Sequence, residues 1–140
     1  GRAECVHRWS ELVVGDRRET IAWLGAKRVI ALAAIGNPDA FVRQIEQANA
    51  VVCGQLVRRD HHSWSESDAA ELGRLVASQS SVDAIVTTEK DWMKLRAIDW
   101  STLPCPIVRP RVDVRFIRGE AELRERLLAA ARRRPLIASR

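Results

Sequence analysis

The feature that most constrains the fold is a continuous apolar run over residues 29–35, bounded by Arg28 and by Gly36. A run of this length without polar alternation predicts a strand that is buried on both faces, as in a parallel sheet. Asn37 and Pro38 then have the form of an N-cap followed by the first residue of a helix. A buried strand that leads directly into a helix is the unit from which parallel α/β sheets are built.

The rest of the chain repeats this alternation. The further elements that we expect are a strand at 51–57, a helix capped by Ser65 or Ser67, a strand at 83–88, a turn or short helix at 89–95, a strand from about Val112 and a helix at about 120–132. This order predicts an α/β, Rossmann-like fold with a mostly parallel sheet and helices on both faces. We expect residues 1–27 to form a connector or hairpin and residues 28–140 to form the α/β domain.

Length and composition exclude several classes of protein. A chain of 140 residues that is 46% hydrophobic and 29% charged is typical of one globular domain. Its longest apolar run is far shorter than the roughly 20 residues that cross a bilayer, and its first residues do not have the form of a signal peptide. The three cysteines are far apart, which argues against a disulfide framework or a structural zinc site. The missing initial methionine indicates that the chain has been cut from a longer one.

The charge pattern is compatible with an anionic partner. The formal net charge is +5, and many of the arginines lie after residue 120. Such a face suits anionic lipid headgroups, a phosphorylated substrate or nucleic acid. An ordinary solvated helix face explains the same arginines equally well.

Three polar segments follow the three expected strands. They are residues 36–38, 60–62 and 87–91. Because ligands in a parallel α/β sheet bind outside the carboxyl ends of the strands, we expect these segments to line one edge. The candidate residues there are Asn37, Asp60, His61, His62, Thr88, Glu89, Lys90, Asp91 and Lys94.

Two histidines beside an acid, Asp60–His61–His62, are the strongest single signal among these segments. Histidine titrates near neutral pH and therefore suits proton transfer or phosphate chemistry. Lys90 and Lys94 lie one helical turn apart, a spacing that suits a phosphate group or local ion pairs. The chain has no Gly-x-x-x-x-Gly-Lys-Ser/Thr sequence, so these residues could assist a reaction without forming a complete nucleotide-hydrolysing site.

Taken together and in order, the segments 34–38, 60–62 and 88–91 with Lys94 resemble the C-terminal half of the tetraacyldisaccharide 4′-kinases. The resemblance implies an ATP-dependent lipid-sugar kinase, a phosphotransferase of lipid A biosynthesis, whose second domain is this chain. It implies that ATP and Mg²⁺ are held mainly by an N-terminal P-loop domain absent from this sequence, so that the present chain alone is inactive. The expected substrate is a tetraacyldisaccharide 1-phosphate, and the expected location is peripheral, at the cytoplasmic face of the bacterial inner membrane. Contact with anionic membrane is expected and contact with nucleic acid is not.

The same resemblance implies roles for single residues. His61 would reach across the cleft, pair with a catalytic aspartate of the P-loop domain and help it to accept the 4′-hydroxyl proton. Asp60 would orient His61, so these two are the candidate catalytic residues. The candidate residues for binding substrate or nucleotide are Asn37, His62, Thr88, Glu89, Lys90, Asp91 and Lys94. No metal ligand is expected in this chain.

Two alternatives remain open from the sequence. Asp-His-His also occurs in metal-dependent phosphoesterases, where it helps to bind paired metal ions that activate water. A non-enzymatic α/β module that binds anionic lipid or nucleic acid through its basic helix is the other. Replacement of His61 by alanine separates them, because the kinase would lose turnover, the phosphoesterase would lose metal and the module would be unaffected.

Overall fold

A computed structural model describes residues 4–118 of the chain, and the side chains of residues 8–113. In chain order the elements are β1 (Glu4–Val14), β2 (Arg17–Glu19), a 3₁₀ turn η1 (Ile21–Leu24), β3 (Arg28–Ala34), α1 (Pro38–Gln47), β4 (Val51–Arg58), α2 (Glu66–Ser78), β5 (Ala84–Thr87), α3 (Glu89–Leu95) and β6 (Ile107–Arg118). Residues 9–111 form one compact unit. The described residues of a second unit, 4–8 and 112–118, are the N-terminal part of β1 and the C-terminal part of β6.

The strands form one six-stranded sheet in the order β2-β1-β6-β5-β3-β4. β3 pairs in parallel with both β4 and β5, and β5 pairs in parallel with β6. The β1–β2 pair is the antiparallel hairpin expected in the first 27 residues, and it belongs to the same sheet. The predicted α/β class and the mostly parallel sheet are therefore confirmed, while a domain boundary at residue 28 stays a prediction.

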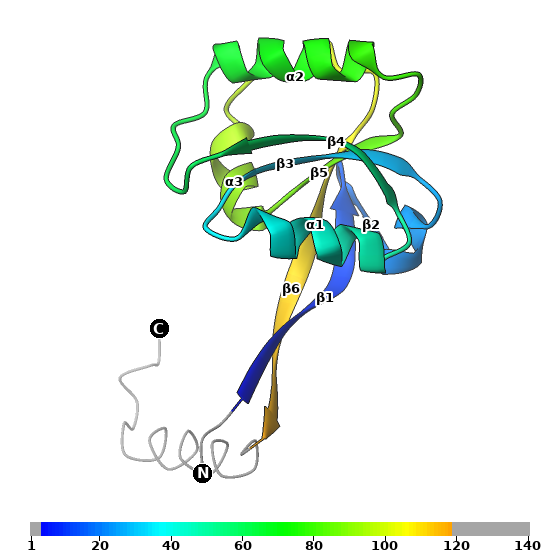
Figure 1. The fold of residues 1–140 in the computed structure, drawn as a ribbon, viewed down its shortest axis with the longest axis vertical. Coiled ribbons are helices and arrows are strands. Elements are labelled where there is room, and N and C mark those ends of the chain that lie inside the picture. The colour runs from blue at the N-terminus through cyan, green and yellow to red at the C-terminus, as the bar shows by residue number, and fades with distance from the viewer. Residues whose placement is uncertain (1–3, 119–140) are drawn as a thin grey trace. The chain divides into compact units, whose positions relative to one another are not determined.

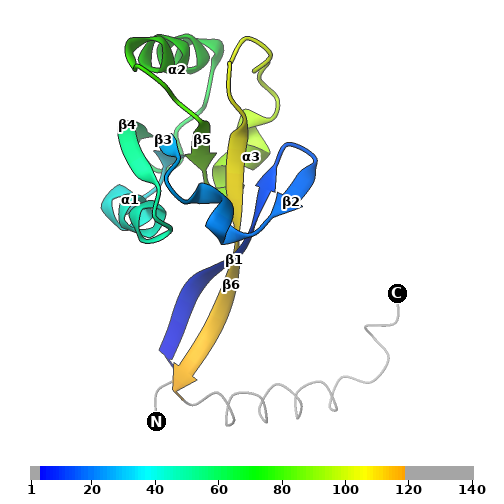
Figure 2. The same cartoon turned by 90° about the vertical axis from the view of Figure 1, so that its right-hand side faces the viewer.

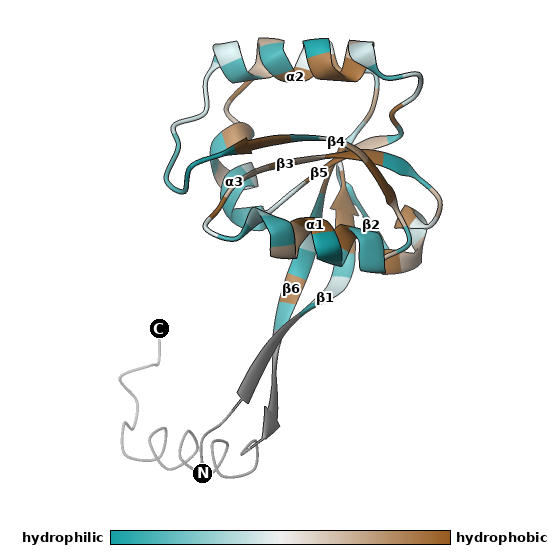
Figure 3. Cartoon of the chain, in the orientation of Figure 1, coloured by the Kyte–Doolittle hydropathy of each residue, from teal (hydrophilic) through white to brown (hydrophobic). Residues whose placement is uncertain are grey.

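Helices cover both faces of the central strands, α1 on one side and α2 on the other (Figures 1 and 2). β3 explains why, since its side chains alternate between two apolar clusters. Val29, Ala31 and Ala33 pack in the cluster that contains α1, whereas Ile30 and Leu32 pack in the one that contains α2 and α3. An apolar strand without polar alternation has to be covered twice, and Figure 3 shows the central strands as hydrophobic between the two helices.

Local side chains set the starts of the helices, and those of α1 and α2 are expected from the sequence. Asn37 caps α1, since its Oδ1 accepts a hydrogen bond from the amide of Ala40 at 3.1 Å. Ser65, rather than Ser67, caps α2, and it forms a capping box with Asp68. Thr88 caps α3 by accepting a hydrogen bond from the amide of Asp91 at 3.0 Å. Each cap follows a strand directly or by a short turn, so the strand ends and the helix starts lie at one edge of the sheet.

One boundary differs from its prediction. β6 begins at Ile107 rather than near Val112, because Ile107 and Val108 pair with Ile85 and Val86 of β5. Pro110, which has no amide hydrogen, interrupts the sequence pattern that indicates a strand and hides this earlier start. The helix expected at about 120–132 and the C-terminal arginines lie outside the described residues. Among residues 4–118, no helix is long and apolar enough to cross a membrane.

Candidate functional site

A tight turn at the end of β4 presents His61. The amide of His62 donates to the carbonyl of Arg59 at 3.1 Å, which closes the turn over residues 59–62. His61 is its third residue and has a φ of 66°, in the left-handed region that normally favours glycine or asparagine there. Its side chain is 84% exposed. The backbone thus holds an imidazole out in solvent at the edge where the parallel strands end.

Asp60 supports this turn from inside. Its Oδ1 accepts a hydrogen bond from the backbone amide of His61 at 3.0 Å, while its Oδ2 lies 3.8 Å from His61 Nε2. The ammonium of Lys90 donates to the same Oδ1, which joins the turn to α3. That hydrogen bond lowers the pKa of Asp60 below its ordinary value and raises the pKa of Lys90. Asp60 therefore holds the backbone of His61 more closely than its ring.

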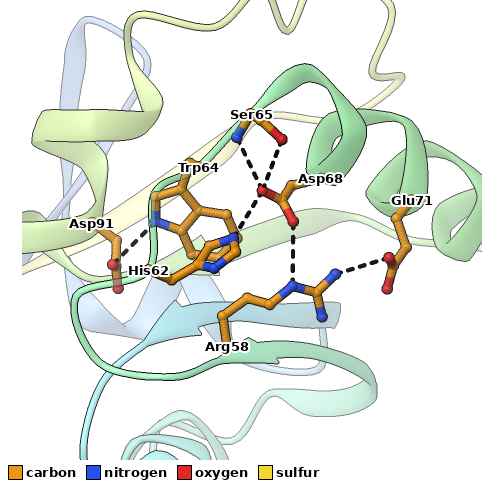
Figure 4. Close-up of polar contacts among 7 residues, drawn as sticks. All are labelled: Arg58, His62, Trp64, Ser65, Asp68, Glu71 and Asp91. Carbon is orange, nitrogen blue, oxygen red and sulfur yellow. Dashed lines mark hydrogen bonds and ion pairs between the residues drawn. The ribbon is translucent and has the colours of Figure 1, made fainter.

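His62 has a different environment from His61. Its Nε2 lies 2.9 Å from Oδ2 of Asp68, and its ring meets Trp64 edge-on with the ring centroids 5.0 Å apart (Figure 4). Only 29% of the His62 side chain is exposed. The two adjacent histidines thus have different environments: His61 is exposed to solvent, and His62 is fixed against α2.

Asp68 is the centre of a polar network on α2 (Figure 4). Its Oδ1 accepts from Arg58 Nε at 3.2 Å, and its Oδ2 accepts from the amide of Ser65 at 2.9 Å as well as contacting His62. Arg58 also donates to Glu71 at 2.8 Å. Burial alone would raise the pKa of Asp68, but hydrogen bonds from His62, Ser65 and Arg58 together hold that pKa below the ordinary value.

Asp91 forms a second, buried polar centre. Its carboxylate accepts hydrogen bonds from the amide of Ala34 at 3.1 Å, the hydroxyl of Thr88 at 2.7 Å and the indole nitrogen of Trp64 at 3.3 Å. Asp91 is only 1% exposed, so this carboxylate joins the end of β3, the start of α3 and the loop after His62. It stabilises the edge of the sheet from within.

The remaining predicted residues lie around this edge. Asn37 caps α1, and Glu89 forms a 3.8 Å ion pair with Arg109, whose guanidinium lies over Trp92. Lys94 is exposed in the last turn of α3. Trp64 and Trp92 pack partly buried against the cluster of α2 and α3.

Sequence reasoning missed Arg58, Trp64 and Asp68 as parts of the site. The Ser65–Asp68 spacing indicates a capping box, but it gives no sign that the same carboxylate binds Arg58 and His62. The His, Cys, Asp and Glu side chains near this edge are the ones that could bind a metal ion. In the part of the chain that it describes, no three His, Cys, Asp or Glu side chains are grouped as metal ligands.

Comparison with known proteins places this chain in a family. The family model described as tetraacyldisaccharide-1-P 4′-kinase matches residues 3–132. The chain belongs to this family. This gives no support to the phosphoesterase and the non-enzymatic module that the sequence left open.

Curated relatives agree with the family match. A tetraacyldisaccharide 4′-kinase of Syntrophus aciditrophicus is 36% identical over 90 residues, which cover 64% of this chain and 24% of the relative. One of Anaeromyxobacter sp. is 34% identical over 113 residues, which cover 79% of this chain and 29% of the relative. The chain therefore spans about a quarter of the length of the kinases that it matches.

A solved structure shows the same fold. The crystal structure of the "apo" form of LpxK from Aquifex aeolicus in complex with ATP matches with a TM-score of 0.55 and 18% sequence identity. The match covers 89% of this chain and 35% of that one. At 18% sequence identity, this likeness shows a shared fold and nothing further.

Proposed function

We propose that this chain is the C-terminal α/β part of an ATP-dependent kinase that phosphorylates the 4′ position of a tetraacyldisaccharide 1-phosphate in lipid A biosynthesis. Family membership over residues 3–132 supports this proposal. The observation in this chain that carries the proposal is the exposed imidazole of His61. His61 has a positive φ in a turn at the edge where the parallel strands β3, β4 and β5 end. That is where an α/β sheet places its working residues.

In this proposal His61 acts on a group from outside the chain. Its imidazole meets the catalytic aspartate of the P-loop domain and takes part in removing the 4′-hydroxyl proton as the phosphoryl group is transferred. Asp60 fixes the backbone of His61, and Lys90 fixes Asp60. Both histidines of the motif then contribute, His61 at the reaction and His62 as its anchor.

The proposed binding residues of this chain act around the substrate or the nucleotide. Lys94 is an exposed cation one helical turn from Lys90, and we propose that it meets a phosphate. The other residues proposed to shape this binding edge are Asn37, His62, Thr88, Glu89, Lys90 and Asp91.

We propose that ATP and Mg²⁺ bind mainly to a P-loop domain outside the given sequence. The sequence has no phosphate-cradling P-loop, and the described side chains make no metal-ligand group. ATP supplies the phosphoryl group when it is bound there.

The substrate class sets the proposed location. A disaccharide with four acyl chains resides in a bilayer, so we propose that the enzyme works peripherally at the cytoplasmic face of the bacterial inner membrane. The net charge of +5 favours contact with anionic lipid headgroups there. Nucleic acid has no part in this proposal.

The test is His61→Ala in the complete gene product that carries this sequence, assayed for ATP-dependent phosphate transfer to tetraacyldisaccharide 1-phosphate. Loss of general-base support lowers kcat by about 100-fold or more. The melting temperature stays unchanged, because the side chain is exposed. Arg59→Ala, at an exposed neighbour in the same turn, is the matched control. If His61→Ala turns over like Arg59→Ala, the proposed role of His61 is wrong.

A further inference from the structure

One carboxylate bridges the residue before the turn that carries His61 and the last residue of that turn. Arg58 is the last residue of β4, and His62 closes the turn. Arg58 binds Oδ1 of Asp68 at 3.2 Å, and His62 lies 2.9 Å from Oδ2 of the same side chain (Figure 4). Arg58 and His62 are therefore fixed to one point on α2.

The conformation of His61 needs such an external constraint. A residue with a Cβ is disfavoured at a φ of 66°, and it keeps that conformation only where its surroundings determine it. The ring of His61 is 84% exposed and gives little packing of its own. The constraint must come from its neighbours in the turn.

Asp68 is well suited to supply this constraint. It is 7% exposed, and the amide of Ser65 at the start of α2 fixes it further. Trp64 packs edge-on against His62 and is itself fixed by Asp91. Asp68 thus connects the start of α2 to Arg58 and His62, which lie on either side of His61 in the sequence.

We propose that Asp68 is a positioning residue for His61, acting through Arg58 and His62 to hold the turn in the conformation that presents the imidazole. This inference rests on the proposed function. It gives the second histidine of the Asp-His-His motif the task of anchoring the first. A capping role of Asp68 confined to α2 would affect stability without acting through His61.

The experiment compares Asp68→Asn with Glu71→Gln in the complete gene product. Both substitutions remove one charge from α2 and one anionic partner of Arg58, but only the first removes the carboxylate that bridges Arg58 and His62. We expect Asp68→Asn to lower kcat by about ten- to a hundredfold through misplacement of His61, with unchanged KM for ATP and lipid. Glu71→Gln should behave as the parent.

A double substitution separates positioning from stability. In a His61→Ala background there is no imidazole left to position, so Asp68→Asn should cause no further loss of kcat. Should Asp68→Asn fail to fold, His62→Phe removes the contact with Asp68 while keeping a ring against Trp64. It should give the same loss of kcat and the same lack of additivity.

The outcomes distinguish this inference from the function beneath it. Retained turnover in His61→Ala would overturn the proposed role of His61 and, with it, the positioning role of Asp68, whereas a parent protein without phosphate transfer would overturn the proposed function. Lost turnover in His61→Ala, combined with parent-like kcat in Asp68→Asn, would overturn the positioning role alone. An equal loss from Asp68→Asn with and without the His61 imidazole would also overturn it, because Asp68 would then act on something else.

Discussion

Asp91 provides the sharpest test of how the edge of the sheet is held together. The substitution Asp91→Ala removes a buried carboxylate that accepts hydrogen bonds from Ala34, Thr88 and Trp64. It leaves the amide of Ala34, which is 2% exposed, without its acceptor. We therefore expect Asp91→Ala to lower the free energy of unfolding clearly.

The size of this loss follows from the three donors. A buried amide left without a partner costs about 1–3 kcal/mol. The indole of Trp64 is partly exposed and loses one ordinary hydrogen bond, about 0.5–1.5 kcal/mol, while the hydroxyl of Thr88 can turn to other acceptors. Removing a buried charge recovers part of its desolvation cost. The net loss should be about 1–4 kcal/mol.

Urea unfolding followed by circular dichroism measures the free energy of unfolding without relying on tryptophan emission. Glu89→Ala is the matched control, because it also removes an acid from the first turn of α3 but is 49% exposed. Both variants lose the same favourable interaction with the helix dipole, about 0.3–1 kcal/mol, so their difference isolates the buried hydrogen bonds. If Asp91→Ala is no less stable than Glu89→Ala, the hydrogen bonds of Asp91 do not stabilise the fold as proposed.

Two further predictions concern the turn and its anchor. His61→Gly should raise the free energy of unfolding by about 1 kcal/mol, because glycine adopts a positive φ without strain, and urea midpoints should show a smaller gain for Asn49→Gly, whose asparagine tolerates the same φ better. Asp68 has a lowered pKa in the folded chain, so its stabilisation is present above the unfolded pKa of about 3.9 and is lost as the pH falls through the lower folded pKa. Asp68→Asn should therefore show a shallower loss of stability in urea titrations below about pH 4, and an unchanged acid limb would contradict this.

Periodicity and capping signals predict most of the fold. The run before Gly36 is so uniformly apolar that only a strand covered on both faces suits it, and Asn37, Ser65 and Thr88 then mark where helices begin. The start of β6 could not be predicted, because its first residues gain their strand pairing from β5 across a proline-rich segment. Which strand pairs with these residues depends on the tertiary structure and cannot be derived from the local sequence.

The candidate site divides in a similar way. The sequence predicts that Asp60, His61 and Lys90 share an edge, and the structure joins them through Asp60. It cannot predict that His61 and His62 have different environments, because the difference arises from the positive φ of His61 and from the contact of His62 with the Asp68 carboxylate on α2. The environments of these adjacent histidines depend on the backbone conformation and on which side chains the fold brings beside each of them.

The position of β6 between β5 and β1 has a consequence for how the chain is made. Ser10 of β1 donates to the carbonyl of Arg111 of β6, a pair that is 101 residues apart in sequence. During synthesis the β1–β2 hairpin emerges before β3, β4 and β5, but its neighbour in the sheet, β6, leaves the ribosome after them. Such long-range pairing slows folding, so we expect the core of β3, β4 and β5 to form first and the hairpin to dock last.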